Sequence, residues 1–265
     1  MRRLMIALAM SASCLGSLSI SPLATAAPAA PSATAAPQSL RSVQQLETLS
    51  YQAATTFYLH SVLNRDPEQM KKTQANLTAG DALVKSLANP AISAKWSAFK
   101  QSISSARFTS EGVPDNDSLN VIDGAHTALT LLLRSNRTEQ RLSANVATDK
   151  MADMLYDQHV LMHTMTAAYL RKSADYFGGA IVQSQAPQVE IDQLANKFTA
   201  QLNMLTKHYA RNAEVALLLR EVNTKWLFIR NSFINFNENN VPFIVGRYND
   251  QITQKLLEAY AKLSQ

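Results

Sequence analysis

Apolar residues recur along this chain at spacings of three and four, most clearly in its second half. Such stripes are typical of helices that pack side by side in a bundle, whereas strands would alternate with a period of two. One stripe comprises Val215, Leu219, Val222, Trp226, Ile229, Phe233 and Phe236. A second comprises Ile191, Leu194, Phe198, Leu202, Leu205 and Tyr209. A third comprises Val245, Tyr248, Ile252, Leu256, Tyr260 and Leu263.

The pattern predicts eight helices separated by Pro, Gly and Asn. Their expected ranges are 39–64, 67–88, 91–108, 117–134, 138–177, 187–210, 213–236 and 241–263. The break at Ser135-Asn136 is weak, so that a single helix over 117–177 is the alternative. Only seven Gly and nine Pro occur in 265 residues, which also favours helices. We therefore predict an all-α fold, an antiparallel helical bundle.

The two halves of the chain share landmarks. Tyr58-Leu59 corresponds to Tyr169-Leu170, and Lys95-Trp96 corresponds to Lys225-Trp226. These pairs predict two related four-helix units, 39–135 and 136–265, that arose by internal duplication. The alternative is that helical segments share a few residues by chance.

The N-terminus has the organisation of a secretory signal peptide. Arg2 and Arg3 precede an apolar stretch, and Ala24-Thr25-Ala26 supplies the small residues of a cleavage site. We expect a signal peptide over 1–26 with cleavage after Ala26, then a disordered leader over 27–38. Export to the periplasm follows. A lipid anchor on Cys14 is the alternative, although Ser11 stands where such sites usually carry Leu.

Composition excludes several classes of protein. Cys14 is the only cysteine, so the processed chain would contain neither disulfides nor a Cys nucleophile. Processing would leave 23 of the 25 basic residues against 20 acidic ones, scattered along the chain, which argues against nucleic-acid binding. No later segment has the roughly 18 uncharged apolar residues of a transmembrane helix.

Candidate catalytic and metal sites are weak. No nucleophile elbow or phosphate-binding loop is present, so no enzymatic activity and no cofactor are expected. Asp149, Asp153 and Asp157 share one helical face, and such a row is more typical of a solvated stripe than of a catalytic pair. His159 and His163 have a spacing that suits a metal or haem iron, but the Glu-x-x-His signature of di-iron bundles is absent. We interpret both as structural histidines and predict no metal site.

The segment 158–170, Gln-His-Val-Leu-Met-His-Thr-Met-Thr-Ala-Ala-Tyr-Leu, resembles a helix motif of the PilJ-like sensor domains. These form the N-terminal family of type IV pili methyl-accepting chemotaxis transducers and are related to the periplasmic domains of nitrate sensors. The residues that match the family pattern are Gln158, Leu161, Met165, Tyr169 and Leu170. The likeness is best over 150–263.

The resemblance implies a sensing helix whose ligand-binding residues would be Gln158, His159, Met162, His163 and Thr164. His159 and Thr164 stand where the family has Arg, and His163 replaces a Gln. Because neutral His lacks the charged fork that meets a planar oxyanion, nitrate should bind poorly. We expect a small ligand that is uncharged or weakly anionic, and we expect Gln158 and His159 to face the interior of the bundle or the interface of its halves.

The sequence thus predicts a periplasmic, non-enzymatic sensory or ligand-binding bundle. Its expected role is that of a soluble accessory, with a membrane receptor or another envelope protein as its partner. A structural or adhesion-type interaction module of the envelope is the alternative. A metal- or haem-binding bundle that uses His159 and His163 is a more remote one.

Overall fold

The computed structural model describes residues 38–143, 149–177, 190–236 and 240–263. These residues form an all-α helical bundle, which confirms the predicted fold class. The helices are α1 (Gln38–Val62), α2 (Pro67–Leu87), α3 (Pro90–Ser104), α4 (Asn116–Ser143), α5 (Lys150–Phe177), α6 (Ile191–His208), α7 (Ala213–Ile234) and α8 (Pro242–Leu263). In the described part of the chain the only β-type pairing is an isolated bridge between Phe108 and Pro114.

Local sequence explains where several helices begin. Asp66 caps α2 by accepting a hydrogen bond from the Glu68 amide, and a proline follows it at the first helical position. Asn89 caps α3 in the same way, again directly before a proline. Asn212 caps α7 through the Val215 amide. Such caps satisfy backbone donors that have no partner within the helix.

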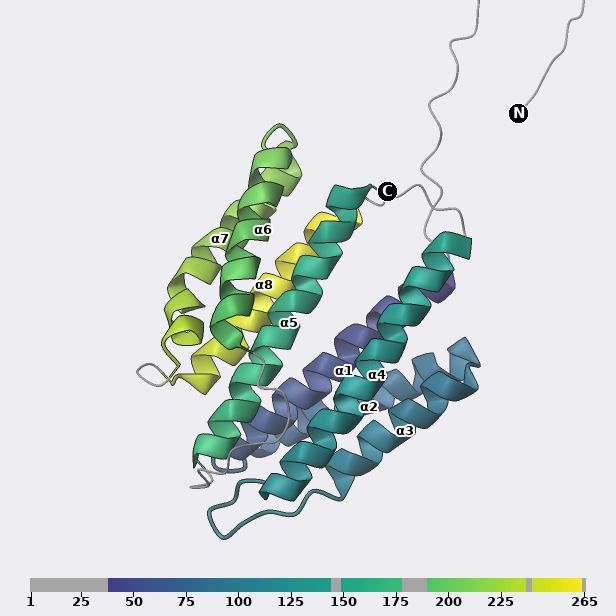
Figure 1. Cartoon of the computed structure of the whole chain (residues 1–265), viewed down its shortest axis with the longest axis vertical. Coiled ribbons are helices and arrows are strands. Elements are labelled where there is room, and N and C mark those ends of the chain that lie inside the picture. The colour runs from purple at the N-terminus through teal and green to yellow at the C-terminus, as the bar shows by residue number, and fades with distance from the viewer. Residues whose placement is uncertain (1–37, 144–148, 178–189, 237–239, 264–265) are drawn as a thin grey trace, which may run out of the picture. The chain divides into compact units, whose positions relative to one another are not determined.

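The helices contact one another in two rings, which Figure 1 shows side by side. In one ring α1 contacts α2 and α4, and α3 contacts the same two helices. In the other α5 contacts α6 and α8, and α7 contacts the same two. The rings meet where α1 packs against α5 and, less extensively, against α8. The relationship of these rings by duplication stays a prediction.

The predicted apolar stripes lie in the core. Every member of the α7 stripe is buried, including Trp226 with 1% of its surface exposed. Trp96 of α3 is buried as well. The α8 stripe is less uniform, because Tyr248, Tyr260 and Leu263 are only partly buried. These three side chains pack against the edge of the core.

Several predicted boundaries are wrong. α4 continues through Ser135-Asn136 to Ser143, and the Asn136 side chain donates to the Leu132 carbonyl at 3.1 Å while it accepts from Asn89. Because its polar atoms are satisfied within the helix and by a neighbour, this Asn does not break the helix. α3 ends at Ser104 rather than at 108, and α5 begins at Lys150 rather than at 138.

The acidic row at the start of α5 is largely solvated, as predicted, since Asp149 and Asp157 are exposed and Asp153 is partly buried, and it also contacts neighbouring groups. Asp157 pairs with Arg137 of α4 at 2.9 Å, and Asp153 pairs with Arg141 of the same helix. Asp149 caps α5 by accepting from the Met151 amide. Two carboxylates of the row therefore form ion pairs between α5 and α4, and the third caps the first turn of α5.

The predicted signal peptide, the leader over 27–38 apart from its last residue, and Cys14 lie outside the described residues. None of the helices in the described part of the chain is long and apolar enough to cross a membrane.

Candidate functional site

α5 carries all five residues that the sequence predicts as ligand-binding, and it packs against α1, α6 and α8. This central position buries most of their side chains. Gln158 and His163 have none of their surface exposed, His159 has 1%, and Met162 is equally inaccessible. Thr164 is partly buried. The structure thus places Gln158 and His159 in the interior, as predicted.

Gln158 points toward α6. Its side-chain nitrogen donates to the Phe198 carbonyl at 2.7 Å, whereas its side-chain oxygen is buried without a partner. One half of the amide is therefore satisfied by the protein itself. The other half carries a desolvation cost, because a buried acceptor without a donor has lost its water.

His159 is held between α1 and α8. Its Nδ1 lies 3.1 Å from the Thr253 carbonyl, and its Nε2 lies 3.0 Å from the Thr48 hydroxyl. Because a carbonyl only accepts, Nδ1 carries the proton, which leaves Nε2 as an acceptor beside the Thr48 hydroxyl; that hydroxyl also lies 3.1 Å from the Gln44 carbonyl. Both ring nitrogens are thereby occupied, which leaves none for a metal or haem iron.

His163 lies one turn further along α5. Its ring meets the edge of the His159 ring at 4.7 Å and stacks on Tyr51 of α1 at 5.8 Å. Nδ1 is 3.5 Å from the Asn249 side-chain nitrogen, and Nε2 is buried without a partner. His126 of α4 completes the cluster, with its ring 4.7 Å from that of Tyr51.

Burial holds these histidines neutral. Loss of hydration lowers the pKa of His126 to about 3, with Arg134 adding to the effect. The same cause lowers the pKa of His159 to about 4 and that of His163 well below its usual value. Neutral, packed imidazoles of this kind are constituents of a core.

Thr164 belongs to a polar network that joins α1, α4 and α5. Its hydroxyl donates to the Tyr51 hydroxyl at 2.9 Å, and Arg134 donates to the same tyrosine at 2.7 Å. Arg134 also pairs with the fully buried Glu47 at 3.2 Å, which accepts from Tyr156 as well. Partners within the network satisfy its charges, so its evident role is to connect helices.

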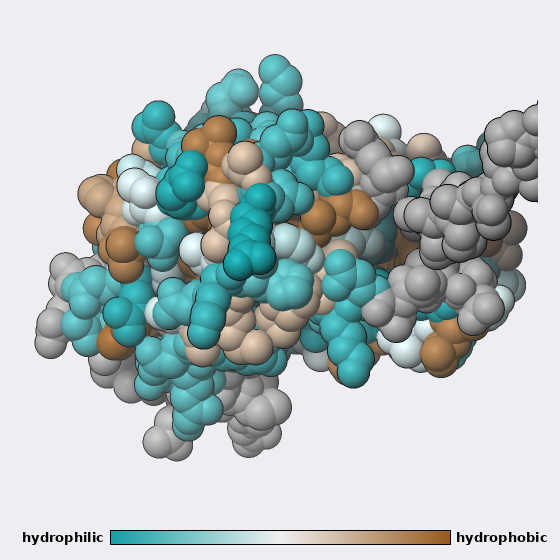
Figure 2. Space-filling view, turned by 90° about the horizontal axis from the view of Figure 1, so that it is seen from above, coloured by the Kyte–Doolittle hydropathy of each residue, from teal (hydrophilic) through white to brown (hydrophobic). Residues whose placement is uncertain are grey.

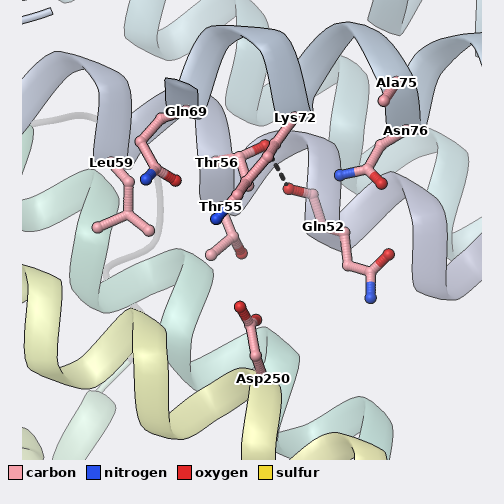
Figure 3. A pocket seen from close by; sticks show the side chains of 9 residues that line it. All are labelled: Gln52, Thr55, Thr56, Leu59, Gln69, Lys72, Ala75, Asn76 and Asp250. Atoms are coloured by element: carbon pink, nitrogen blue, oxygen red, sulfur yellow. Dashed lines mark hydrogen bonds between the residues drawn. The ribbon is translucent and has the colours of Figure 1, made fainter. Parts of the chain in front are cut away.

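A hollow lies elsewhere, between α1, α2 and α8, and none of the five predicted residues lines it (Figure 3). It encloses about 250 Å³. Most of the residues that line it have polar side chains; they are Gln52, Thr55, Thr56, Leu59, Gln69, Lys72, Ala75, Asn76 and Asp250.

Three of these side chains give the hollow its chemistry. Thr55 is 2% exposed, and its hydroxyl has no hydrogen-bond partner. Figure 3 shows Asp250 of α8 pointing toward Thr55 and toward the Lys72 amine, which comes from α2. Asp250 is exposed to solvent. The neighbouring helices nevertheless remove part of its hydration, which raises the pKa of its carboxyl, whereas the hydrogen bond from Asn249 and the charge of Lys72 partly oppose this increase.

The hollow is connected to the histidine cluster. The Asn249 side-chain nitrogen donates to the Asp250 carboxylate at 3.1 Å and lies 3.5 Å from His163 Nδ1. Asn249 therefore stands between a residue of the hollow and a predicted residue of α5. The motif on α5 lies behind the wall of the hollow rather than on its surface.

Sequence reasoning missed the hollow. Its residues belong to three helices that are distant in the sequence, and each looks like an ordinary surface residue of an amphipathic helix. One signal was present, since Gln52, Thr55 and Thr56 interrupt the apolar residues of α1 with polar ones. Within the described ranges no three His, Cys, Asp or Glu side chains are grouped so as to hold a metal ion.

No family model, curated protein or solved structure matches the chain.

Proposed function

We propose that this protein is a non-enzymatic ligand-binding bundle of the bacterial envelope, which is exported to the periplasm and signals by contact with a membrane receptor or another envelope protein. The observation that carries the proposal is the hollow between α1, α2 and α8, whose lining includes Thr55, a buried residue whose hydroxyl has no hydrogen-bond partner. The binding site proposed here is thus the hollow, and the α5 motif supports it from behind.

The energetics of Thr55 favour a ligand. A buried hydroxyl without a hydrogen bond costs about 1–3 kcal/mol relative to a satisfied one. A ligand or an ordered water that bonds to it would recover part of this cost. The amides of Gln52 and Asn76 line the same hollow and add donors and acceptors. Small-molecule sites commonly combine concavity with a few convergent polar groups of this kind.

The duplication proposed from the sequence has support in the two tryptophans. The Trp96 indole of α3 donates to Asp81 of α2 at 2.8 Å. The Trp226 indole of α7 donates to Thr199 of α6 at 3.1 Å. In each case the indole of one helix bonds to the helix that precedes it, as two related four-helix units would require. The PilJ-like origin of the second unit rests on the 158–170 motif.

Thermal unfolding with added small molecules tests the binding proposal. The panel comprises free amino acids, dicarboxylates, neutral sugars, nitrate and nitrite, each at millimolar concentration. At least one should raise the melting temperature, because a ligand that binds only the folded state stabilises it. Thr55→Val should remove that shift, whereas Thr224→Val on the exposed face of α7 should preserve it. If no molecule shifts the wild type, the ligand-binding function is wrong.

Mass spectrometry of the periplasmic fraction tests export. An N-terminus at Ala27 is expected, and a full-length cytoplasmic protein would contradict the proposal. A lipid on Cys14 would instead place the protein on a membrane surface.

The alternative function, an interaction module, is favoured by a separate observation. Phe228 of α7 is 64% exposed and stacks on Tyr248 of α8 at 4.8 Å. Leu227 and Phe243 are also exposed. On the face drawn in Figure 2, however, hydrophobic residues form small patches among hydrophilic ones. A photo-crosslinker at position 228, compared with one at Lys207 of α6, tests this alternative in cells. A protein crosslinked from position 228 and not from 207, together with no small molecule that shifts the melting temperature, would favour the interaction module.

A further inference from the structure

Two side chains of opposite charge line the hollow without forming an ion pair. Lys72 and Asp250 lie on opposite walls, and Asp250 is close enough for Lys72 to lower its pKa. Among the described residues, neither side chain forms an ion pair, with the other or with any third group. The Asp250 carboxylate accepts one hydrogen bond, from Asn249, on Oδ1. Figure 3 shows this carboxylate directed into the hollow.

The size of the hollow limits what can bridge these charges. Its volume of about 250 Å³ lies below the roughly 300–1,000 Å³ of ordinary ligand pockets. A small metabolite would fill it, whereas a peptide or a nucleotide would extend beyond its rim. Figure 3 shows Thr55 between the Lys72 amine and Asp250, and the amides of Gln52 and Asn76 line the hollow to one side of them.

We propose that the hollow binds a small zwitterion of the free α-amino-acid type. Its carboxylate would pair with Lys72, its ammonium group with Asp250, and one carboxylate oxygen would accept from the Thr55 hydroxyl. This inference rests on the proposed ligand-binding function and deepens it by naming the chemical class of the ligand.

Other charge types fit the walls less well. An anion such as nitrate would be attracted by Lys72 but repelled by Asp250. A simple cation would be attracted by Asp250 but repelled by Lys72. A neutral sugar would leave both charges without a counterion. Only a molecule with both signs of charge satisfies both walls, and charge-assisted hydrogen bonds are the stronger ones in proteins. This ligand differs from the uncharged or weakly anionic one that the α5 motif suggests, because Lys72 and Asp250 converge only in the fold.

A matched set of ligands tests the charge requirement. Thermal unfolding with each of the common free L-amino acids should identify at least one that binds. Calorimetry should then compare that amino acid with its amide, which lacks the carboxylate, and with its N-acetyl derivative, which lacks the ammonium group. Each derivative should bind at least about tenfold more weakly, the loss of one charge-assisted hydrogen bond. A derivative that binds as tightly as the parent overturns the proposal.

Variants of the two walls provide the second arm. Lys72→Met and Asp250→Asn should each weaken binding of the amino acid by at least about tenfold. Lys71→Met and Asp192→Asn are the controls, because these residues are exposed, as Lys72 and Asp250 are, but lie outside the hollow. Circular dichroism and the melting temperature without ligand verify that every variant is folded. Full binding by either wall variant would contradict the inference.

The outcomes separate this inference from the function on which it rests. If no amino acid binds but a sugar, dicarboxylate or nitrate does, and Thr55→Val removes that binding, the zwitterion is wrong and the ligand-binding function stands. If no molecule of either panel binds, both fail.

Discussion

The indole of Trp96 in α3 lies directly against the backbone of α2 at Gly80. A methyl group added at Gly80 would come within 2.1 Å of the Trp96 ring. The tryptophan is buried and fixed by its bond to Asp81, so it has no room to retreat. Gly80 is therefore required by the close approach of two helices.

Gly80→Ala should destabilise the protein by about 1–3 kcal/mol, the usual cost of overpacking, in spite of the better helix propensity of Ala. Gly124→Ala in α4 is the matched control, because nothing lies within 4 Å of the added methyl group. It should stabilise by up to about 1 kcal/mol. Urea unfolding followed by circular dichroism measures both. Equal effects of the two substitutions would show that α2 and α3 do not approach so closely.

Trp226→Ala should cost about 3–5 kcal/mol, as expected for a large buried aromatic residue. The ring packs on Phe198 at 4.6 Å and on Phe233 at 5.6 Å. Leu227→Ala changes the adjacent residue, which is 60% exposed, and should change stability by less than about 0.5 kcal/mol. A loss below about 1 kcal/mol for Trp226→Ala would mean that this residue serves a surface role.

Arg134→Met should cost about 3 kcal/mol, because it leaves the Glu47 carboxylate buried without its cation. The double variant with Glu47→Gln should recover a substantial part of this loss. Arg107→Met is the control: Arg107 pairs with Asp115 and Asp117 but is 68% exposed, so its loss should cost less than about 1 kcal/mol. Strictly additive effects in the double variant would be incompatible with a direct Glu47–Arg134 interaction.

Gln158→Leu should change stability by less than about 1 kcal/mol, because the lost bond to Phe198 is offset by removal of the unpaired amide oxygen. Gln158→Ala loses the same bond and also opens space in the core, so it should be the more destabilising of the two. Chemical unfolding of both variants provides the comparison. A loss above about 2 kcal/mol for the Leu variant would indicate that a buried water or ligand satisfies the oxygen.

Acid should destabilise the protein through its buried histidines. The pKa of His126, His159 and His163 is lowered in the folded state, so between pH 6.5 and about 4 the unfolded chain binds more protons than the folded one. Stability is therefore fully present above pH 6.5 and is lost as the pH falls, by up to about 1.4 kcal/mol per pH unit for each histidine. Carboxyls with a raised pKa, Asp123, Asp175 and Asp250, act in the opposite direction and temper the loss.

Urea unfolding at pH 7, 6 and 5 measures this dependence. His163→Gln should make the profile flatter, because it removes a histidine that binds a proton in the unfolded chain but is held neutral in the folded protein. His208→Gln, on the exposed face of α6, controls for the loss of a histidine elsewhere. Identical profiles for the two variants would show that burial of His163 does not govern the acid response.

The sequence by itself determined the helices and the core of this protein. Stripes such as Val215 to Phe236 follow from the period of the α-helix, and burial of their apolar surface is the dominant favourable term in folding. Caps such as Asp66 and Asn89 are equally local, because their partners lie two or three residues away. Burial of Gln158 and His159 could be predicted for the same reason, since both share a helix with apolar neighbours at fixed spacing.

Only the tertiary structure decided which polar residues meet. Asp157 and Arg137 pair across α5 and α4, and Lys72 and Asp250 face each other although 178 positions separate them. A helical pattern specifies which face of each helix is buried, but it does not specify which helix covers that face or at what level along its axis. The hollow, the charges on its walls and the Asn249 link to His163 depend on those choices, and for that reason they emerge only when the helices are packed.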